Sequence, residues 1–181
     1  LEVEHEFRAS QQCIHDLKWS PNGRLFAVAC HDTRTRLYDV NKGYAAHCEL
    51  VGHSNHVLHI DWSADSYSLM TACAGFELLY WDAASGGEKP SGAIELRDMR
   101  MASWTCPFGW PAKGIWPSYS EGTYYTAVDR SPDDRLLAAA DSYGRVKLFQ
   151  HPCTELHASA ASHIAHSPCV SSCRWLADSH T

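Results

Sequence analysis

Short apolar runs separated by turn-forming residues recur along the chain. One run contains Ile14, Leu17 and Trp19, the next spans 25–30, and the tetrapeptide SPNG lies between them. Proline presets φ for a turn, and asparagine, aspartate and glycine tolerate tight bends. SADS and SPDD divide later apolar runs in the same way. The pattern predicts short antiparallel strands joined by hairpin turns.

The strand pattern belongs to an internal repeat. Residues 13–40 align without gaps with 56–83, at an offset of about 43 residues, and 124–151 form a third copy. Trp19 falls on Trp62 in this alignment. The segment VSSCRW at 170–175 begins a fourth copy.

Each copy has the length and strand content of a β-propeller blade. A WD-like dipeptide closes the third strand, as at Trp81-Asp82, and Gly52-His53 and Ala165-His166 precede the first strand. The sequence thus resembles the WD-repeat proteins. It predicts an all-β partial WD-repeat propeller of about three four-stranded antiparallel blades plus the start of a fourth.

The expected organisation is one partial propeller over 1–181. Its parts are the last strand of a preceding blade (1–9), a first blade (13–53), a second blade (56–96), an aromatic insertion (97–123), a third blade (124–166) and the start of a fourth (169–181). Such a segment does not close on itself, so we expect the isolated chain to aggregate or oligomerise through its open edges.

The hydrogen-bond network that locks typical blades, formed by a histidine, an aspartate and the tryptophan of the WD pair, looks incomplete. Asp32 has Ser10 where the histidine should stand, and His53 and Trp81 face Gly75 in place of the aspartate. The sequence therefore predicts blades held mainly by apolar packing. Structural roles are expected for Trp19, Trp62, Trp81, His53, His166, Asp32, Trp104 and Trp116.

Composition and charge narrow the function classes. The chain is 45% hydrophobic and 20% charged, with a formal net charge of −6, so it lacks the basic footprint of a protein that binds nucleic acid or an anionic membrane. LEVEHEF does not match a signal peptide, and the longest apolar runs are too short to span a bilayer. These features predict a soluble intracellular chain. Its eight cysteines are expected to be free thiols, with Cys30 and Cys73 in the core of neighbouring blades, too far apart for a disulfide.

The segment SWTCPFGWPAKGIWP, 103–117, holds three of the seven tryptophans and lies in the insertion between the second and third blades. We expect Trp104 and Trp116 to pack against the blades and Trp110 to lie near the loop tip beside Lys113. Aromatic anchors dominate interface energies, whereas rim charges guide encounter. The candidate partner-binding residues are Trp110, Lys113, Arg97, Arg100 and Tyr119.

The motifs WTC, GIWP and KLF-x-x-PC, at matching separations within 97–153, resemble the echinoderm microtubule-associated protein-like family. The resemblance implies part of the second propeller of a tandem atypical propeller domain, and a non-catalytic scaffold that binds tubulin or microtubules through its loops. It also implies a cytoplasmic, cytoskeletal location on microtubules, with cilia as a further candidate site. The implied partners are tubulin or another protein, and the remaining blades of a longer chain.

Two alternatives differ in class. One is a generic WD-repeat adaptor for another protein. The other is a zinc-binding module that uses the cluster His151, Cys153, His157, His163, His166, Cys169 and Cys173. The cluster lacks the usual spacing of zinc ligands, and no GxSxG, HExxH or phosphate-cradling loop is present. We therefore expect no enzyme activity, no metal and no cofactor.

Overall fold

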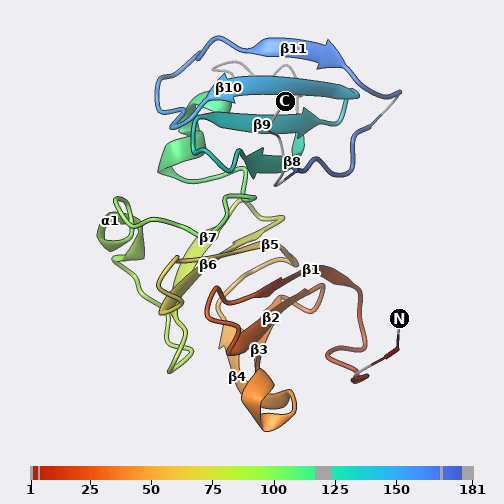
Figure 1. The fold of residues 1–181 in the computed structure, drawn as a ribbon, viewed down its shortest axis with the longest axis vertical. Helices are drawn as coiled ribbons and strands as arrows, with labels where there is room; N and C mark the ends of the chain where they lie inside the picture. Colours follow the sequence, from red (N-terminus) through yellow and green to blue (C-terminus); the bar gives the residue numbers. More distant parts are fainter. Residues whose placement is uncertain (1, 4, 117–123, 168, 177–181) are drawn as a thin grey trace. The chain divides into compact units, whose positions relative to one another are not determined.

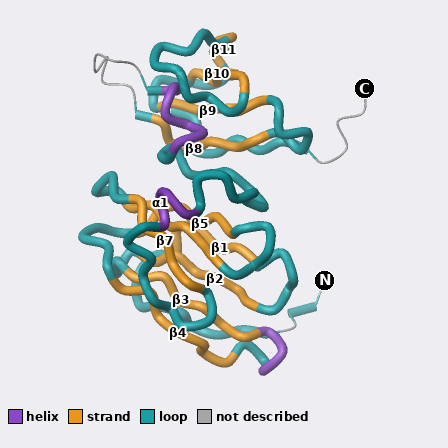
Figure 2. The backbone as a smooth tube through the Cα atoms, turned by 90° about the vertical axis from the view of Figure 1, so that its left-hand side faces the viewer, coloured by secondary structure: helices purple, strands orange, loops and turns teal. Residues whose placement is uncertain are grey.

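The computed structural model describes residues 2, 3, 5–116, 124–167 and 169–176. It divides into two compact units, Leu1–Ala102 and Ser103–Thr181. The strands form three antiparallel sheets of four, three and four strands, coloured along the chain in Figure 1. Strands predominate in both units, as Figure 2 shows, and the all-β prediction is confirmed. No helix in the described ranges is long and apolar enough to cross a membrane.

The first sheet has the strand order β1-β2-β3-β4. Its strands are β1 (Ile14–Trp19), β2 (Leu25–Cys30), β3 (Arg34–Asp39) and β4 (Ala45–Val51), with the short 3-10 helix η1 (Val40–Lys42) between the last two. The predicted SPNG turn joins β1 to β2, since Ser20 N–H donates to Leu25 O at 2.8 Å and Gly23 has a φ of 70°. This sheet has the four strands expected of a blade.

The second sheet has three strands, where the sequence predicts four. They are β5 (Val57–Trp62), β6 (Ser68–Cys73) and β7 (Leu78–Asp82), in that order. After β7 the chain turns at once, because the Asp82 carboxylate accepts from both the backbone and the hydroxyl of Ser85, and Gly86 takes a φ of 72°. An isolated bridge from Trp81 to Glu88 follows, then the short helix α1 (Gly92–Glu95) and a second bridge from Met101 back to Ser63. A single bridge thus stands where the outer strand is expected.

The core of the first unit lies between these two sheets. One apolar cluster combines side chains of both, including Leu37 and Leu50 from the first sheet and Trp62 and Trp81 from the second. Trp62 is 1% exposed, and its Nε1 donates to Lys18 O of β1 at 3.2 Å. The two blades of this unit therefore share one apolar core.

Trp19, at the equivalent repeat position, is 49% exposed and contacts only the rings of Phe26 and Tyr44 among its aromatic neighbours. The structural role expected of Trp19 therefore differs from that of Trp62, which β1 covers. The described part of 1–9 contains no strand either, although Phe7 packs against Tyr38 with ring centroids 4.6 Å apart.

The second unit contains a four-stranded sheet of order β11-β10-β9-β8. Its strands are β8 (Tyr125–Arg130), β9 (Leu136–Asp141), β10 (Arg145–Gln150) and β11 (Ala161–Ile164), and the 3-10 helix η2 (Trp110–Ile115) precedes them. Residues 169–176 form no strand. Trp175 nevertheless donates from Nε1 to Asp129 O at 2.9 Å, the same contact that Trp62 makes with Lys18 in the first unit.

The second blade contains a connected polar network, which corrects the sequence-based expectation of a broken one. Trp81 Nε1 donates to Thr71 Oγ1 at 2.7 Å, and His53 Nε2 lies 2.7 Å from the same oxygen. His53 Nδ1 is 3.4 Å from a carboxylate oxygen of Glu77, too poorly aligned for a hydrogen bond. The repeat pattern places the carboxylate of this network at Gly75. Glu77, two positions later, supplies it instead.

The other two expected network residues behave differently. Asp32 accepts from the Ser10 hydroxyl at 3.0 Å and pairs with Arg36 at 2.9 Å, so serine and arginine take the place of histidine around this carboxylate. His166 is exposed, and its backbone N–H donates to Gly144 O at 3.1 Å. The blades therefore share backbone topology but not one set of polar contacts.

Candidate protein-binding insertion

Two segments that the sequence analysis singled out, GIWP and the PC pair after β10, meet in the second unit. Gly114 N–H donates to Cys153 O, and Cys153 N–H donates to Pro111 O, each at 2.7 Å. A Cβ on Gly114 would lie 2.3 Å from Glu155 O, closer than any side chain can approach a backbone oxygen. Glycine is therefore required for this approach of the two backbones.

Trp104 and Trp116, two of the aromatic side chains of the insertion, differ in how they are held. Trp104 is 6% exposed, whereas Trp116 is half-buried. Trp116 Nε1 donates to Pro107 O at 2.8 Å, its ring stacks on Phe108 with centroids 5.5 Å apart, and it meets the edge of Tyr125. Trp116 is thus held by a hydrogen bond and ring contacts, whereas Trp104 is held by burial.

Trp110 and Lys113 are the exposed side chains of η2, whose other residues are buried. Trp110 is 39% exposed. In a 3-10 helix, side chains at i and i+3 lie one above the other, so these two share one side of the helix. The buried residues and the hydrogen bonds to Cys153 hold η2 in place, so a rigid backbone presents an aromatic ring and an ammonium group together.

A hollow of about 320 Å³ lies beside η2 in the same unit. Its lining comprises Gly114, Ile115, Trp116, Lys147, Phe149, His157, Ala158, Ala160 and Ser162. The Lys147 ammonium lies 5.7 Å from the centre of the Tyr125 ring and 3.4 Å from its hydroxyl. The hollow is large enough to receive a side chain of a bound protein.

The remaining candidate binding residues lie in the first unit or outside the described residues. Arg97 and Arg100 are exposed and belong to the first unit, where Arg100 O accepts from Ala64 N–H at 2.8 Å. Tyr119 lies outside the described residues. Trp110 and Lys113 therefore form the best defined part of the candidate site.

The His/Cys cluster at 151–173 does not gather in the part of the chain that the structure describes. Cys153 is buried, and His151 Nδ1 lies 3.1 Å from Asp134 O, with burial lowering the pKa of this histidine. The groups of three metal-ligand side chains found among the described residues lie elsewhere, at His15, His31 and His56 and at His53, Cys73 and Glu77. Sequence reasoning missed both groups.

The repeat alignment partly indicates the group formed by His15, His31 and His56. His31 follows the second strand of one blade and His56 precedes the first strand of the next, so both stand at the same end of antiparallel strands. Partial burial, followed by the proximity of His56 and His31, lowers the pKa of His15. The spacing alone could not show that the three rings converge.

The chain is similar to a known protein family and to several of its members. The family model for the second β-propeller of echinoderm microtubule-associated proteins matches residues 1–181. The 77 kDa echinoderm microtubule-associated protein of Lytechinus variegatus is 38% identical over 169 residues, which cover 91% of this chain and 25% of that protein. Echinoderm microtubule-associated protein-like 2 of Rattus norvegicus is 37% identical over 168 residues, which cover 91% of this chain and 26% of that protein. The chain thus spans about a quarter of the length of these curated relatives.

A solved structure supports the fold independently. The Cps50 (Swd1) β-propeller domain of Myceliophteria thermophila superimposes with a TM-score of 0.62 at 15% identity, over 92% of this chain and 59% of that one. The predicted partial propeller is thereby confirmed. Since the family model matches from the first residue to the last, the chain belongs to the echinoderm microtubule-associated protein family, as part of that family's second β-propeller.

Proposed function

We propose that this chain is part of a non-catalytic scaffold of a microtubule-associated protein, and that it binds tubulin through loops of its propeller. The relatives are named as microtubule-associated proteins, and propellers commonly use rigid blades to display binding loops. The proposed location is the cytoplasm, on microtubules, including those of cilia. No binding of nucleic acid or membranes is proposed, because the net charge is −6.

In this proposal η2 carries the contact. Trp110 is the aromatic anchor, since a large ring on a fixed backbone loses little conformational entropy on binding. Lys113 favours approach to an acidic surface. Arg97 and Arg100 are further exposed cations that this proposal assigns to the contact. The observation that carries the proposal is the exposure of Trp110 and Lys113 on a helix whose other side chains are buried.

Co-sedimentation with microtubules tests this proposal in the full-length protein. Trp110→Ala and Lys113→Glu should each weaken capture by about tenfold, the effect of losing about 1.4 kcal/mol of binding free energy. The matched controls are Tyr67→Ala, an exposed aromatic side chain of the first unit, and Arg24→Glu, an exposed cation there. Both controls should bind as the unchanged protein does.

The outcome that would refute this role for η2 is equal capture by all of these proteins. Binding of a different protein that depends on Trp110, with no dependence of microtubule capture on it, would instead favour the generic adaptor. Thermal melts of each variant exclude loss of folding as the cause.

A further inference from the structure

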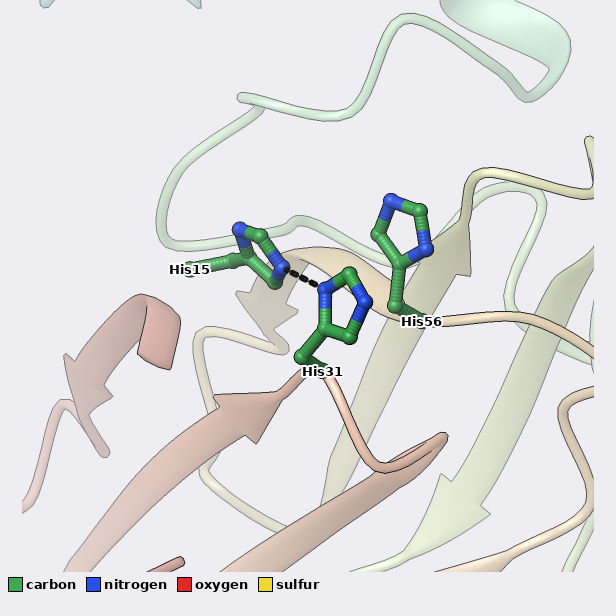
Figure 3. A group of neighbouring side chains, drawn as sticks. All are labelled: His15, His31 and His56. Atoms are coloured by element: carbon green, nitrogen blue, oxygen red, sulfur yellow. Dashed lines mark hydrogen bonds between the residues drawn. The ribbon is translucent and has the colours of Figure 1, made fainter. Parts of the chain in front are cut away.

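Three histidine rings from separate strand ends converge in the first unit. His15 Nε2 and His31 Nδ1 are 2.9 Å apart, and the His31 and His56 rings stack with centroids 4.4 Å apart. Figure 3 shows the His15 and His31 rings meeting through their hydrogen bond, with the His56 ring beside them. One nitrogen from each ring lies within 4.8 Å of the other two. His15 and His31 are exposed and His56 is half-buried, so an ion could enter from solvent.

A β-bulge and backbone hydrogen bonds hold the three residues in place. His15 is the extra residue of a β-bulge in β1, where the register shifts between Ile14 and Asp16, and bulges re-aim side chains out of the regular alternation. The His31 N–H donates to Cys13 O at 2.9 Å. On the second blade, His56 O accepts from Ala74 N–H at 3.0 Å. The rings thus project from hydrogen-bonded backbone in both blades.

The geometry is close to that of a three-histidine metal site. Zinc binds imidazole nitrogen at about 2.0–2.1 Å, which places two nitrogens of a tetrahedral ion about 3.3 Å apart. The shortest pair here is below that separation and the longest is at most 4.8 Å, so rotation about the side-chain bonds suffices to bring all three nitrogens to one ion. Neutral imidazole favours zinc, copper and nickel, whereas magnesium and calcium favour oxygen ligands.

The second group of ligand types, at His53, Cys73 and Glu77, does not offer the same opportunity, because the glutamate oxygens and the thiol already have partners. His53 Nε2 is bonded to the Thr71 hydroxyl. Both Glu77 oxygens accept from Ser54, and the Cys73 thiol donates to Glu77 at 3.3 Å. That group is a structural network of the second blade.

We propose that His15, His31 and His56 form a binding site for a divalent transition-metal ion of the zinc class. The ion would exchange the hydrogen bond between His15 and His31 for three nitrogen ligands, leaving its fourth position to water. Because His15 and His31 belong to the first blade and His56 to the second, a bound ion would add a metal link to the apolar packing and hydrogen bonds that already join these two blades.

The direct test is equilibrium dialysis of zinc against the full chain, freed of any histidine tag and stripped of metal. We expect one equivalent to bind at this site and excess magnesium not to displace it. His15→Ala, His31→Ala and His56→Ala should each weaken zinc binding by about tenfold or more, since even the residues that only orient metal ligands alter affinity by 10–100-fold. His163→Ala, which removes an exposed histidine of β11, is the matched control and should leave binding unchanged.

A second measurement uses the unchanged protein and so does not depend on how the variants fold. Histidine ring NMR signals recorded during a zinc titration should shift together for three of the twelve histidines and reach their end point at one equivalent. Absence of a one-equivalent transition would overturn the proposal. So would equal zinc affinity in the three variants and the control, or shifts confined to histidines outside this group.

Discussion

The Thr71 hydroxyl is the centre of the polar network in the second blade. The substitution Thr71→Val tests how much that network contributes to the free energy of unfolding. Thr71 is fully buried, and its Oγ1 accepts from Trp81 Nε1. Burial lowers the pKa of His53, which keeps its ring neutral, and the nearby Glu77 carboxylate favours a proton on Nδ1. Nε2 then accepts the hydroxyl proton of Thr71. Thr71→Val therefore leaves one buried donor and one buried acceptor without partners.

The magnitude follows from those two groups. A buried polar group that loses its partner destabilises a protein by about 1–3 kcal/mol, so the two groups left by Thr71→Val should lower the free energy of unfolding by about 2–6 kcal/mol. Valine has nearly the shape of threonine, so no cavity contributes. Urea unfolding of the full chain, followed by tryptophan fluorescence, measures the change.

Thr35 provides the matched control. It is a threonine of β3, 1% exposed, whose Oγ1 is buried without a hydrogen-bond partner. Thr35→Val removes an unsatisfied hydroxyl and should leave stability unchanged or raise it. If Thr71→Val and Thr35→Val have equal effects, the hydroxyl link between Trp81 and His53 contributes nothing and the reasoning fails.

Three further changes follow from the structure. The pKa of Glu77 is held at about 2, chiefly by the hydroxyl and the backbone N–H of residue 54, so the stability contributed by its carboxylate is complete above pH 4.5 and is lost as the pH falls toward 2. Acid unfolding of Glu77→Gln should show a smaller loss over that window, and an identical profile would contradict the assignment. Gly114→Ala forces a Cβ against a backbone oxygen and should lower stability by about 1–3 kcal/mol in urea unfolding, whereas Gly87→Ala, with only a serine hydroxyl nearby, should not. Trp104→Ala should lower stability by about 3–5 kcal/mol because the ring is buried, while Trp110→Ala should leave the melting temperature nearly unchanged; the reverse order would place the anchor at Trp104.

The local elements and their repetition could be predicted from the sequence because they depend on short-range physics. Turn formers such as SPNG and SPDD stand between apolar runs, and strands form where those runs occur. The period of about 43 residues is sufficient to identify blades, since each copy must bury its apolar side chains against the next. The motifs GIWP and KLF-x-x-PC could be read in the same way, but not the contact between the backbones of Gly114 and Cys153 that joins them in this chain.

Partners that depend on side-chain reach could not be predicted. The repeat pattern locates the network carboxylate at Gly75, but a glutamate two positions later has a longer side chain and brings its oxygens to His53 and Ser54. Trp19 and Trp62 are equivalent in the alignment and differ in exposure because only Trp62 has another blade against its ring in the first unit.

The outer strand of the second sheet and the convergence of the histidines were also decided by tertiary structure. The sequence carries strand-forming residues up to Asp82, and the hydrogen bonds of that carboxylate to Ser85 form a tight turn, after which the chain pairs with β7 through one isolated bridge in place of a full strand. His15, His31 and His56 are ordinary turn and strand-end residues in the sequence. They come together because a bulge redirects His15 and because blade packing brings the start of β5 beside the ends of β1 and β2. A repeat pattern records which residues face the core, whereas the distances between side chains of different blades depend on how those cores are packed together.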